Sequence, residues 1–412
     1  MKKYYTIEQG LSREEMLVDL DACVRSKVHE MIKELLNAEV DTYLEKHRNN
    51  VLADGKPAIV RNGYHKTREF TGLVGTVKVE VPRTRNRKNE PDNFISSLIP
   101  PYMRRSVTID KAIPLLYLRG LSNGDFLPSL QALFGDRIKG VSSTNITRLK
   151  SKWREDYEEW KQKDLSKKRY CYVWVDGIHV NVRFSSDRLC ILVAIGALED
   201  GTKEVLAVQA GYRESAESWT VLLRDLRQRG LNPPSLFIGD GSLGFWKALV
   251  EIYPRSRQQR CWVHKIANVL DKLPKSVQSK AKSMLHEIYK APDKETAEKS
   301  FDAFVNVFEA KYPGAVKCLS KDREKLLTFY DFPAEHWRHI RSTNVIESTF
   351  STVRLRTKKT RGQGNEETTL LMVYKLIDQA SVSWRRLNGS GLIPKVISGV
   401  KFVDGIEDEK AA

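Results

Sequence analysis

The segment Tyr170-Cys-Tyr-Val-Trp-Val-Asp-Gly-Ile-His-Val-Asn-Val-Arg-Phe184 predicts the centre of a β-sheet. Residues 170–175 are apolar, as in a strand covered on both faces, and alternating apolar positions over residues 178–184 predict a second strand. Asp176 and Gly177 lie between them and predict a bend. The Asp176 carboxylate either starts a tight turn or lies at the strand end, where it can hold a cation. This segment alone favours the turn, whereas the rest of the chain favours the cation.

More strands and helices are predicted on the C-terminal side of this segment. A third strand is expected over residues 189–196, with an extension of the sheet over residues 204–208. Another strand over residues 235–240 again ends in an acid, Asp240, which a glycine follows. The remaining elements of the series are helices over residues 215–230 and 243–252 and a strand over residues 258–263. This β-β-β-α-β-α-β series predicts an α/β fold.

The chain on either side of this series is predicted to be largely helical. Residues 12–47 have helical periodicity and begin with a capping box of Ser12 and Glu15. Residues 265–330 lack strand patterning and predict an all-helical insertion. In chain order the expected segments are an N-terminal helical region (1–60), a small basic β element (61–105), a helix-turn-helix DNA-binding domain with linker (106–165), the first part of the core (166–265), the helical insertion (266–335), the second part of the core (336–390) and a C-terminal tail without clear pattern (391–412).

The composition is strongly basic. The chain of 412 residues carries a formal net charge of +17, and a protein this basic most often binds nucleic acid. Its five cysteines are scattered without a disulfide spacing. Neither a signal-peptide core nor an apolar run of about 20 residues is present. We therefore expect a cytoplasmic DNA-binding protein with no membrane contact.

Three basic clusters are candidate DNA-binding surfaces. Short helices over residues 109–118, 122–134 and 144–153, with glycines between them, are typical of a helix-turn-helix that enters the major groove. A basic β element precedes them, and a run of cations follows Glu347. Helix pairs and solvated charge runs that never touch DNA are the alternatives. The residues expected to contact DNA are Asn145, Arg148, Lys150 and Lys152 in the third helix, Arg83 and Arg85 in the β element, and Arg354, Arg356, Lys358, Lys359 and Arg361.

Three carboxylates are candidate metal ligands. Asp176 and Asp240 end hydrophobic strands, and Glu347 opens a helix expected to pack on the same sheet. Mg²⁺ prefers carboxylate oxygens and leaves coordination positions open for phosphate. Two such ions, about 4 Å apart, can clamp the attacking and leaving oxygens of a displacement at phosphorus. The acids therefore predict a site for two Mg²⁺ ions, or Mn²⁺ in their place, that acts on phosphodiesters.

Several blocks of the sequence resemble the mutator-type insertion-sequence transposases of bacteria, in collinear order over roughly residues 10–390. The resemblance implies a ribonuclease H-like catalytic core interrupted by an all-helical insertion. It also implies an Asp-Asp-Glu triad at Asp176, Asp240 and Glu347. Besides the opening segment, the main blocks are Asp240-Gly-Ser-Leu-Gly-Phe-Trp-Lys-Ala-Leu249, Gln259-Arg-Cys-Trp-Val-His264 and His336-Trp-Arg-His-Ile-Arg-Ser-Thr-Asn-Val-Ile-Glu-Ser-Thr-Phe350.

The function implied by this resemblance is DNA transposition in the bacterial nucleoid. Water activated by metal would attack a phosphodiester at the end of the element, and the freed 3′-hydroxyl would attack target DNA. Terminal inverted repeats and target DNA would be the partners, and the joining of two ends implies a homodimer or larger assembly. The alternatives are a non-catalytic helix-turn-helix regulator and a ribonuclease H-like nuclease without strand transfer.

A Cys-x-x-His pair, Cys261 and His264, lies between the second and third acids. Structural zinc usually takes four ligands, and no second pair has a fitting spacing, with His286 and Cys318 the nearest candidates. The resemblance places the pair next to the insertion, where it contributes to the architecture of the site. We expect a packing or hydrogen-bonding role, with zinc binding as the alternative.

Overall fold

The computed structural model describes residues 13–88, 93–119, 121, 126–134, 143–182, 188–211, 213–241, 243–360 and 364–408. The chain forms two compact units, Met1–Leu149 and Lys150–Ala412. Across the described residues, no helix has both the length and the apolar character needed to cross a bilayer.

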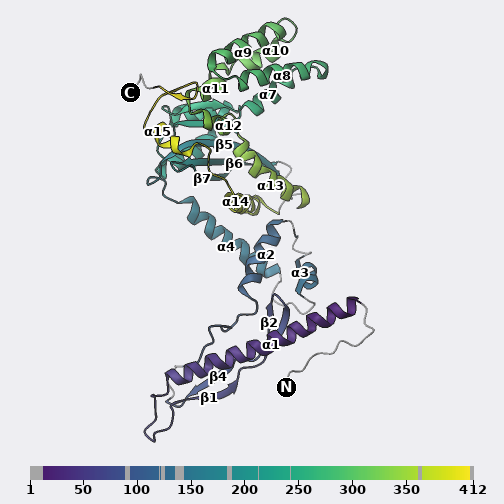
Figure 1. The fold of residues 1–412 in the computed structure, drawn as a ribbon, viewed down its shortest axis with the longest axis vertical. Coiled ribbons are helices and arrows are strands. Elements are labelled where there is room, and N and C mark those ends of the chain that lie inside the picture. Colours follow the sequence, from purple (N-terminus) through teal and green to yellow (C-terminus); the bar gives the residue numbers. More distant parts are fainter. Residues whose placement is uncertain are drawn as a thin grey trace. The chain divides into compact units, whose positions relative to one another are not determined.

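The first unit packs one long helix on two pairs of antiparallel strands (Figure 1). Helix α1 spans Arg13–Lys46, as expected from its periodicity. Its Leu36 and Val40 belong to the same buried cluster as the valines of β3. The N-terminal helix and the basic β element, expected as separate segments, therefore share one core. The strands are β1 (Ile59–Tyr64), β2 (Arg68–Gly72), β3 (Gly75–Val79) and β4 (Pro82–Asn86), with β1 paired to β4 and β2 to β3.

Three helices follow in the order expected for a helix-turn-helix: α2 (Val107–Arg119), α3 (Phe126–Phe134) and α4 (Ser143–Lys161). Ser122, expected to cap the second helix, and Gly135, expected to end it, lie outside the described residues. Helix α4 is longer than predicted, because the mixed-charge stretch after Trp153 continues it. Its later turns belong to the second unit, where the Tyr157 hydroxyl donates to the Val208 carbonyl at 2.8 Å.

The second unit contains a five-stranded mixed sheet in the order β7-β6-β5-β8-β9. Strand β6 runs antiparallel to both β5 and β7, whereas β5, β8 and β9 are parallel. The strands are β5 (Tyr170–Asn181), β6 (Arg188–Leu198), β7 (Lys203–Gly211), β8 (Leu236–Gly239) and β9 (Arg257–Arg260).

The central strand β5 passes straight through Asp176 and Gly177, so the predicted bend is wrong. Strand β6 pairs along this whole stretch, with Asp176 opposite Val193. The glycine provides space instead of a turn, because a Cβ at Gly177 would lie 2.5 Å from Oε1 of Glu214. Asp-Gly is a common turn pair, and only the tertiary packing shows that Gly177 makes room for Glu214 instead of forming a turn.

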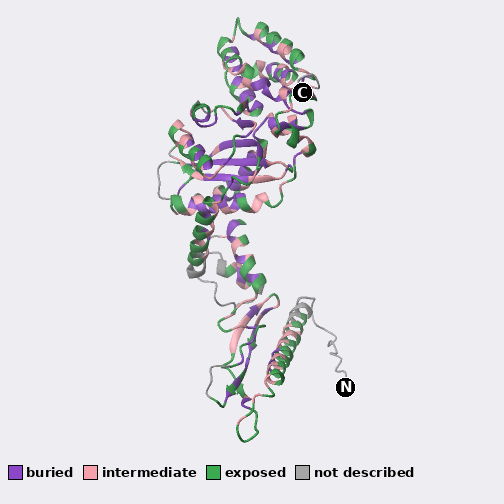
Figure 2. Cartoon of the chain, turned by 90° about the vertical axis from the view of Figure 1, so that its left-hand side faces the viewer, coloured by how far each residue is buried: buried purple, intermediate pink, exposed green. Residues whose placement is uncertain are grey.

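Helices cover both faces of the sheet, which is almost entirely buried (Figure 2). On one face, Val173 and Val175 pack into a cluster with side chains of α5 (Ala216–Gln228) and α6 (Leu243–Ile252). On the other face lie α12 (Trp337–Ile340), α13 (Asn344–Thr360) and α14 (Glu366–Ser381). There the Trp174 indole donates to the His339 carbonyl at 2.9 Å. Because side chains alternate along a strand, Asp176 is on the α13 face and Gly177 on the α5 face.

The segment between β9 and α12 is helical, as predicted, and α8, α9 and α10 group together to one side of the sheet (Figure 1). Strand β9 ends at Arg260, earlier than expected, because Trp262 and Val263 begin helix α7. The helices are α7 (Trp262–Leu270), α8 (Lys275–Lys290), α9 (Lys294–Phe308), α10 (Pro313–Ser320) and α11 (Arg323–Leu327).

The C-terminal tail has more structure than its sequence pattern predicted. It forms α15 (Ile393–Ile397) and a hairpin of β10 (Phe402–Val403) with β11 (Ile406–Glu407). Gly405 in the hairpin turn has a φ of +82° and donates its N–H to the Tyr330 carbonyl at 3.1 Å. The tail therefore packs against the end of the helical segment.

Candidate active site

The register of the parallel strands places Asp176 beside Asp240. Val175 of β5 is opposite Gly239 of β8, so the next residue in each chain segment is an aspartate. Strand β9 extends this edge, because Gly239 is opposite Arg260 and the Cys261 N–H donates to the Gly239 carbonyl at 2.8 Å. Adjacent parallel strands therefore present two carboxylates and a thiol at one edge of the sheet.

Glu347 reaches this edge from the first turn of α13. Ile346, Phe350 and Val353 recur at helical spacing, are fully buried, and lie on the face of α13 that packs towards β5. The helix start is fixed by Thr343, whose main-chain N–H donates to Cys261 Sγ at 3.3 Å.

His264, in the first turns of α7, is close to all three acids. Its Nε2 lies 3.7 Å from Oε1 of Glu347. A hydrogen bond with Cys261, together with the charges of Asp176 and Asp240, raises the pKa of His264 to about 9, against the opposing effect of burial. Glu347 is thus within ion-pair range of the imidazole, while Asp176 and Asp240 act on it through their charge. These acids come from segments far apart in the sequence and lie near the same side chain.

Asp176 is a buried carboxylate, 7% exposed. Burial raises its pKa to about 7, and the neighbouring charges of Asp240 and Glu214 add to this rise. The nearby His264 and a hydrogen bond from the Gly177 N–H act in the opposite direction without cancelling it. The site therefore concentrates negative charge that the polypeptide only partly neutralises.

Glu214 is a fourth acid at this edge, and the sequence reasoning did not single it out. Its carboxylate lies against Gly177 and within 3.3 Å of His179 Nε2. Burial and the charge of Asp240 raise the pKa of Glu214, while His179 lowers it. The sequence gives only a weak indication that Glu214 belongs to the site, because an acid just before a helix cap is common. What distinguishes Glu214 is its contact with Gly177 in the folded chain.

The hydrogen bonds of Cys261 favour the expected architectural role for the Cys-x-x-His pair. The thiol is fully buried and accepts from the main-chain N–H of Thr343. Cys261, His264 and Glu347 bring donor atoms within 4.8 Å of one another. The two residues considered as additional zinc ligands are engaged elsewhere, because Cys318 contacts the Asn268 carbonyl and His286 packs on Tyr289.

The Thr343 hydroxyl joins these side chains, so replacing Thr343 by Val is expected to impair the site. The hydroxyl lies 3.1 Å from Glu347 Oε1 and 3.4 Å from His264 Nδ1. Loss of a group that orients a ligand lowers activity about tenfold, and a lost buried hydrogen bond costs about 1 kcal/mol of stability. Thr343→Ser keeps the hydroxyl and is the control. An unchanged activity of the Thr343→Val protein would contradict this role.

The basic residues expected to contact DNA differ in exposure. Asn145 lies in α4 and Lys359 in α13, but the side chains of both are outside what the structure describes. Arg361 is outside the described residues. Arg356 is buried, 3% exposed, because it shares the inward face of α13 with Val353. Lys150 is half-buried, which lowers its pKa. The exposed members are Arg83, Arg85, Arg148, Lys152, Arg354 and Lys358.

Comparison with known proteins places the chain in a family. A family model described as "Transposase, Mutator family" matches residues 2–386. The chain is 50% identical over 297 residues to the transposase for insertion sequence element IS6120 of Mycolicibacterium smegmatis, covering 72% of this chain and 92% of that protein. It is 47% identical over 286 residues to the transposase for insertion sequence element IST2 of Acidithiobacillus ferrooxidans, covering 68% of this chain and 94% of that protein.

Among solved structures, the chain is similar to the Drosophila P element transposase strand transfer complex, with 12% identity, a TM-score of 0.32, and coverage of 74% of this chain and 84% of that chain. This likeness is too distant to carry a conclusion. The family match and the two bacterial relatives confirm the resemblance predicted from the sequence blocks. The chain belongs to the Mutator family of transposases.

Proposed function

We propose that this transposase cuts DNA at the ends of an insertion sequence and joins them to target DNA through an Asp-Asp-Glu site formed by Asp176, Asp240 and Glu347. One observation carries the proposal: the strand register places Asp176 beside Asp240, and both of these acids and Glu347, from distant segments, lie near the imidazole of His264. Buried carboxylates repel one another and also repel the anionic DNA backbone. Such a cluster would therefore weaken a protein that only binds DNA.

The proposed core is ribonuclease H-like. Support comes from the sheet, in which three consecutive antiparallel strands are followed by two parallel strands on the far side of the first, in the order β7-β6-β5-β8-β9. In the sequence, the helical segment α7–α11 comes after the last strand of this sheet and before the helix that carries Glu347, which is the position expected of an insertion.

The residues of the site fit divalent magnesium. Asp176, Asp240 and Glu347 offer the hard oxygen donors that Mg²⁺ prefers. The raised pKa of Asp176, caused by burial and by neighbouring acids, is what a carboxylate shows when its counter-cation is missing. We propose two Mg²⁺ ions per site, for which Mn²⁺ can substitute, and Asp176, Asp240 and Glu347 would hold them.

The reaction we propose has two displacements at phosphorus. Water attacks the phosphodiester at the element end and releases a 3′-hydroxyl, which then attacks a phosphodiester of target DNA. When bound, the cations would lower the pKa of the attacking oxygen and neutralise charge on the phosphoryl group. The chain supplies no covalent nucleophile; its acids position the cations, and His264 is close enough to balance their charge.

DNA contact is proposed for three surfaces: a cleft in the first unit, the exposed side of α13 in the second unit, and the helices α2–α4. In the first unit, a cleft of about 1400 Å³ is lined by Arg68, Arg83, Arg85 and Arg104 among other residues. Such a density of guanidinium groups suits a phosphate backbone. In the second unit, Arg354 and Lys358 are exposed on α13, beyond the turn that carries Glu347. We also propose that α2–α4 bind DNA as a helix-turn-helix, with Arg148 and Lys152 exposed on α4.

The proposed joining of two element ends also requires that two ends be held together. We therefore propose that the protein acts as a homodimer or larger assembly on its DNA.

The function is tested by incubating the purified protein with Mg²⁺, labelled element ends and a target plasmid. Joined products are expected. Cut ends without joining would favour a nuclease, and bound but intact DNA would favour a regulator; either result would contradict the proposal.

Neutralising Arg354 and Lys358 together, as Gln, is expected to flatten the salt dependence of DNA binding. Each lost phosphate contact lowers the slope of log K against log salt by about 0.9, so the pair should lower it by about 2. The double change Lys395→Gln and Lys401→Gln, on exposed positions near the C-terminus, is the control for loss of net charge. Equal slopes for the wild type and the Arg354 and Lys358 variant would exclude phosphate contact by α13.

A further inference from the structure

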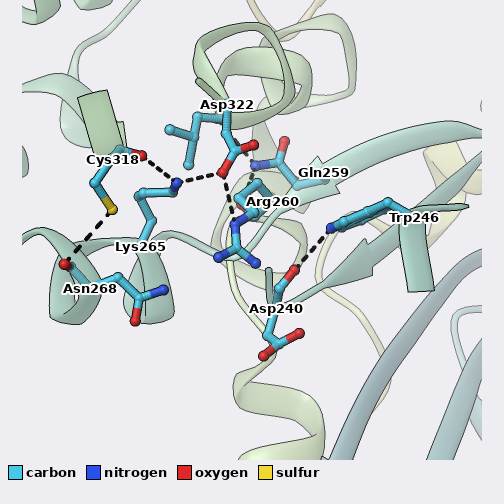
Figure 3. A network of polar contacts seen from close by, with 9 residues as sticks. Asp240, Trp246, Gln259, Arg260, Lys265, Asn268, Cys318 and Asp322 are labelled. Atoms are coloured by element: carbon cyan, nitrogen blue, oxygen red, sulfur yellow. Dashed lines mark hydrogen bonds and ion pairs between the residues drawn. The ribbon is translucent and has the colours of Figure 1, made fainter. Parts of the chain in front are cut away.

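Two buried cations share one partly buried carboxylate behind the turn that follows Asp240 (Figure 3). Lys265 is 0% and Arg260 is 2% exposed. Asp322, between α10 and α11, pairs with Lys265 Nζ and lies 3.3 Å from Arg260 Nε. Burying charge is costly unless it is compensated, and one carboxylate here faces two cations. The reaction proposed above makes no direct use of either cation.

The guanidinium of Arg260 lies against the turn itself. A Cβ at Gly241 would be 1.6 Å from Arg260 Nη2 and 2.0 Å from its Cζ, so a side chain at this position cannot coexist with the guanidinium as placed. Figure 3 shows the guanidinium between Asp322 on one side and Asp240 on the other. Because Gly241 has no side chain, the guanidinium of Arg260 can occupy the space beside it.

Packing and charge hold the guanidinium in this place. Its Nη1 is buried, and among the described residues it has no hydrogen-bond acceptor. The Nε atom is within ion-pair range of Asp322 but is not aligned for a hydrogen bond. Asp322 is itself fixed by Lys265, which also donates to the Cys318 carbonyl at 2.7 Å. The position of Arg260 therefore depends on the helical segment.

The same segment approaches the other side of the turn. The Trp246 indole donates to the Asp240 carbonyl at 3.1 Å (Figure 3). Lys325 of α11 places its Nζ 5.7 Å from the centroid of the Trp246 ring, within cation–π range. Neighbouring residues of the helical segment, Asp322 and Lys325, thus contact the two side chains that brace Asp240 and Gly241.

We propose that Arg260 is a positioning residue that fixes the Asp240–Gly241 turn, and with it the Asp240 carboxylate, at a place set by the helical segment through Asp322. This inference rests on the proposed function, because it assigns a role in holding the proposed metal ligand Asp240. It gives the helical segment a part in catalysis: it supports the second acid of the triad from behind.

The test is a double-mutant cycle of Gly241→Ala and Arg260→Ala. Removing Arg260 leaves Lys265 paired with Asp322 as a balanced pair, so the fold should survive. Arg260→Ala is expected to raise the Mg²⁺ concentration for half-maximal end cleavage about tenfold, as for other residues that support metal ligands. Gly241→Ala should be at least as severe, since its Cβ displaces the guanidinium. The double variant should match Arg260→Ala, because the clash is gone.

A second readout separates positioning from general stability. The Mg²⁺ concentration that raises the unfolding temperature should shift upwards in Arg260→Ala and Gly241→Ala by the same factor as in the cleavage assay. Arg257→Lys, on the same strand and more exposed, is the matched control and should keep the wild-type Mg²⁺ dependence.

An unchanged Mg²⁺ dependence in Arg260→Ala would overturn the inference, and so would single effects that multiply in the double variant. Failure of this inference is distinguishable from failure of the proposed function. If Asp240→Asn abolishes cleavage while Arg260→Ala behaves as wild type, only the positioning role is lost. If Asp240→Asn itself cleaves normally, the proposed function fails.

Discussion

Replacing Asp240 by Asn is expected to lower the rate of end cleavage about 1000-fold or more, a loss of about 4 kcal/mol in transition-state stabilisation. Asp240 and Asp176 lie on adjacent parallel strands, and both act on His264. An amide is a poor substitute because it brings no negative charge to the cations proposed here. Asp176→Asn and Glu347→Gln should have effects of similar size, because the three acids act as a unit.

Binding of the element end should survive these changes within about twofold, since removing an acid reduces repulsion of the DNA backbone. Strand cleavage is measured by single-turnover release of a labelled end, and binding by gel shift in the same buffer. Asp271→Asn, at the exposed end of α7, is the matched control and should cleave at the wild-type rate. A cleaving Asp240→Asn protein would show that the triad is wrongly assigned.

The second large effect is on stability: without metal at pH 8, Asp176→Asn is expected to be more stable than the wild type. The pKa of Asp176 is about 7 in the folded protein, raised by burial and by Asp240 from 3.8. The folded state then binds a proton more tightly than the unfolded chain, so stability falls as pH rises from about 4 to about 7. Above that range the full penalty, about 4 kcal/mol at most, weakens the wild type but not the amide.

Chemical unfolding at pH 8 and at pH 4, in the presence of a chelator, measures this effect. The variant should exceed the wild type at pH 8, and the difference should largely disappear at pH 4. Adding Mg²⁺ at pH 8 should stabilise the wild type and have little effect on the variant, because the cation removes the same repulsion. A less stable Asp176→Asn protein at pH 8 would mean that Asp176 is not under electrostatic strain.

Strand patterns made much of the second unit predictable. The apolar run before Asp176 and the strand that ends at Asp240 are short, β-branched and flanked by glycine, so their positions followed from local preference. The pairing of Val175 with Gly239, which brings the two acids together, is set by tertiary contacts and has no local signal. The sequence periodicity therefore identifies Asp176 and Asp240 as candidate site residues, and the register of β5 with β8 places them next to each other.

Sequence reasoning missed the roles of Gly177 and Glu214 and the burial of Arg356 for one reason. Each depends on residues that are distant in the sequence but packed close by in the fold. Gly177 was expected to bend the chain, but it leaves room for Glu214, which comes from the start of another element. Arg356 lies in a run of cations that favours exposure, yet the helix turns it inwards with Val353. Neither outcome follows from neighbours along the chain, since each is decided by what packs against the residue.

The most direct measurement is anomalous scattering from crystals soaked in Mn²⁺. We expect two peaks about 4 Å apart, bound by Asp176 and Asp240 at about 2.1 Å, with Glu347 on one of them. His179, Cys190 and Glu214 also bring possible ligand atoms within 4.8 Å of one another. A metal at that cluster instead, or no peak at the three carboxylates, would contradict the proposed site.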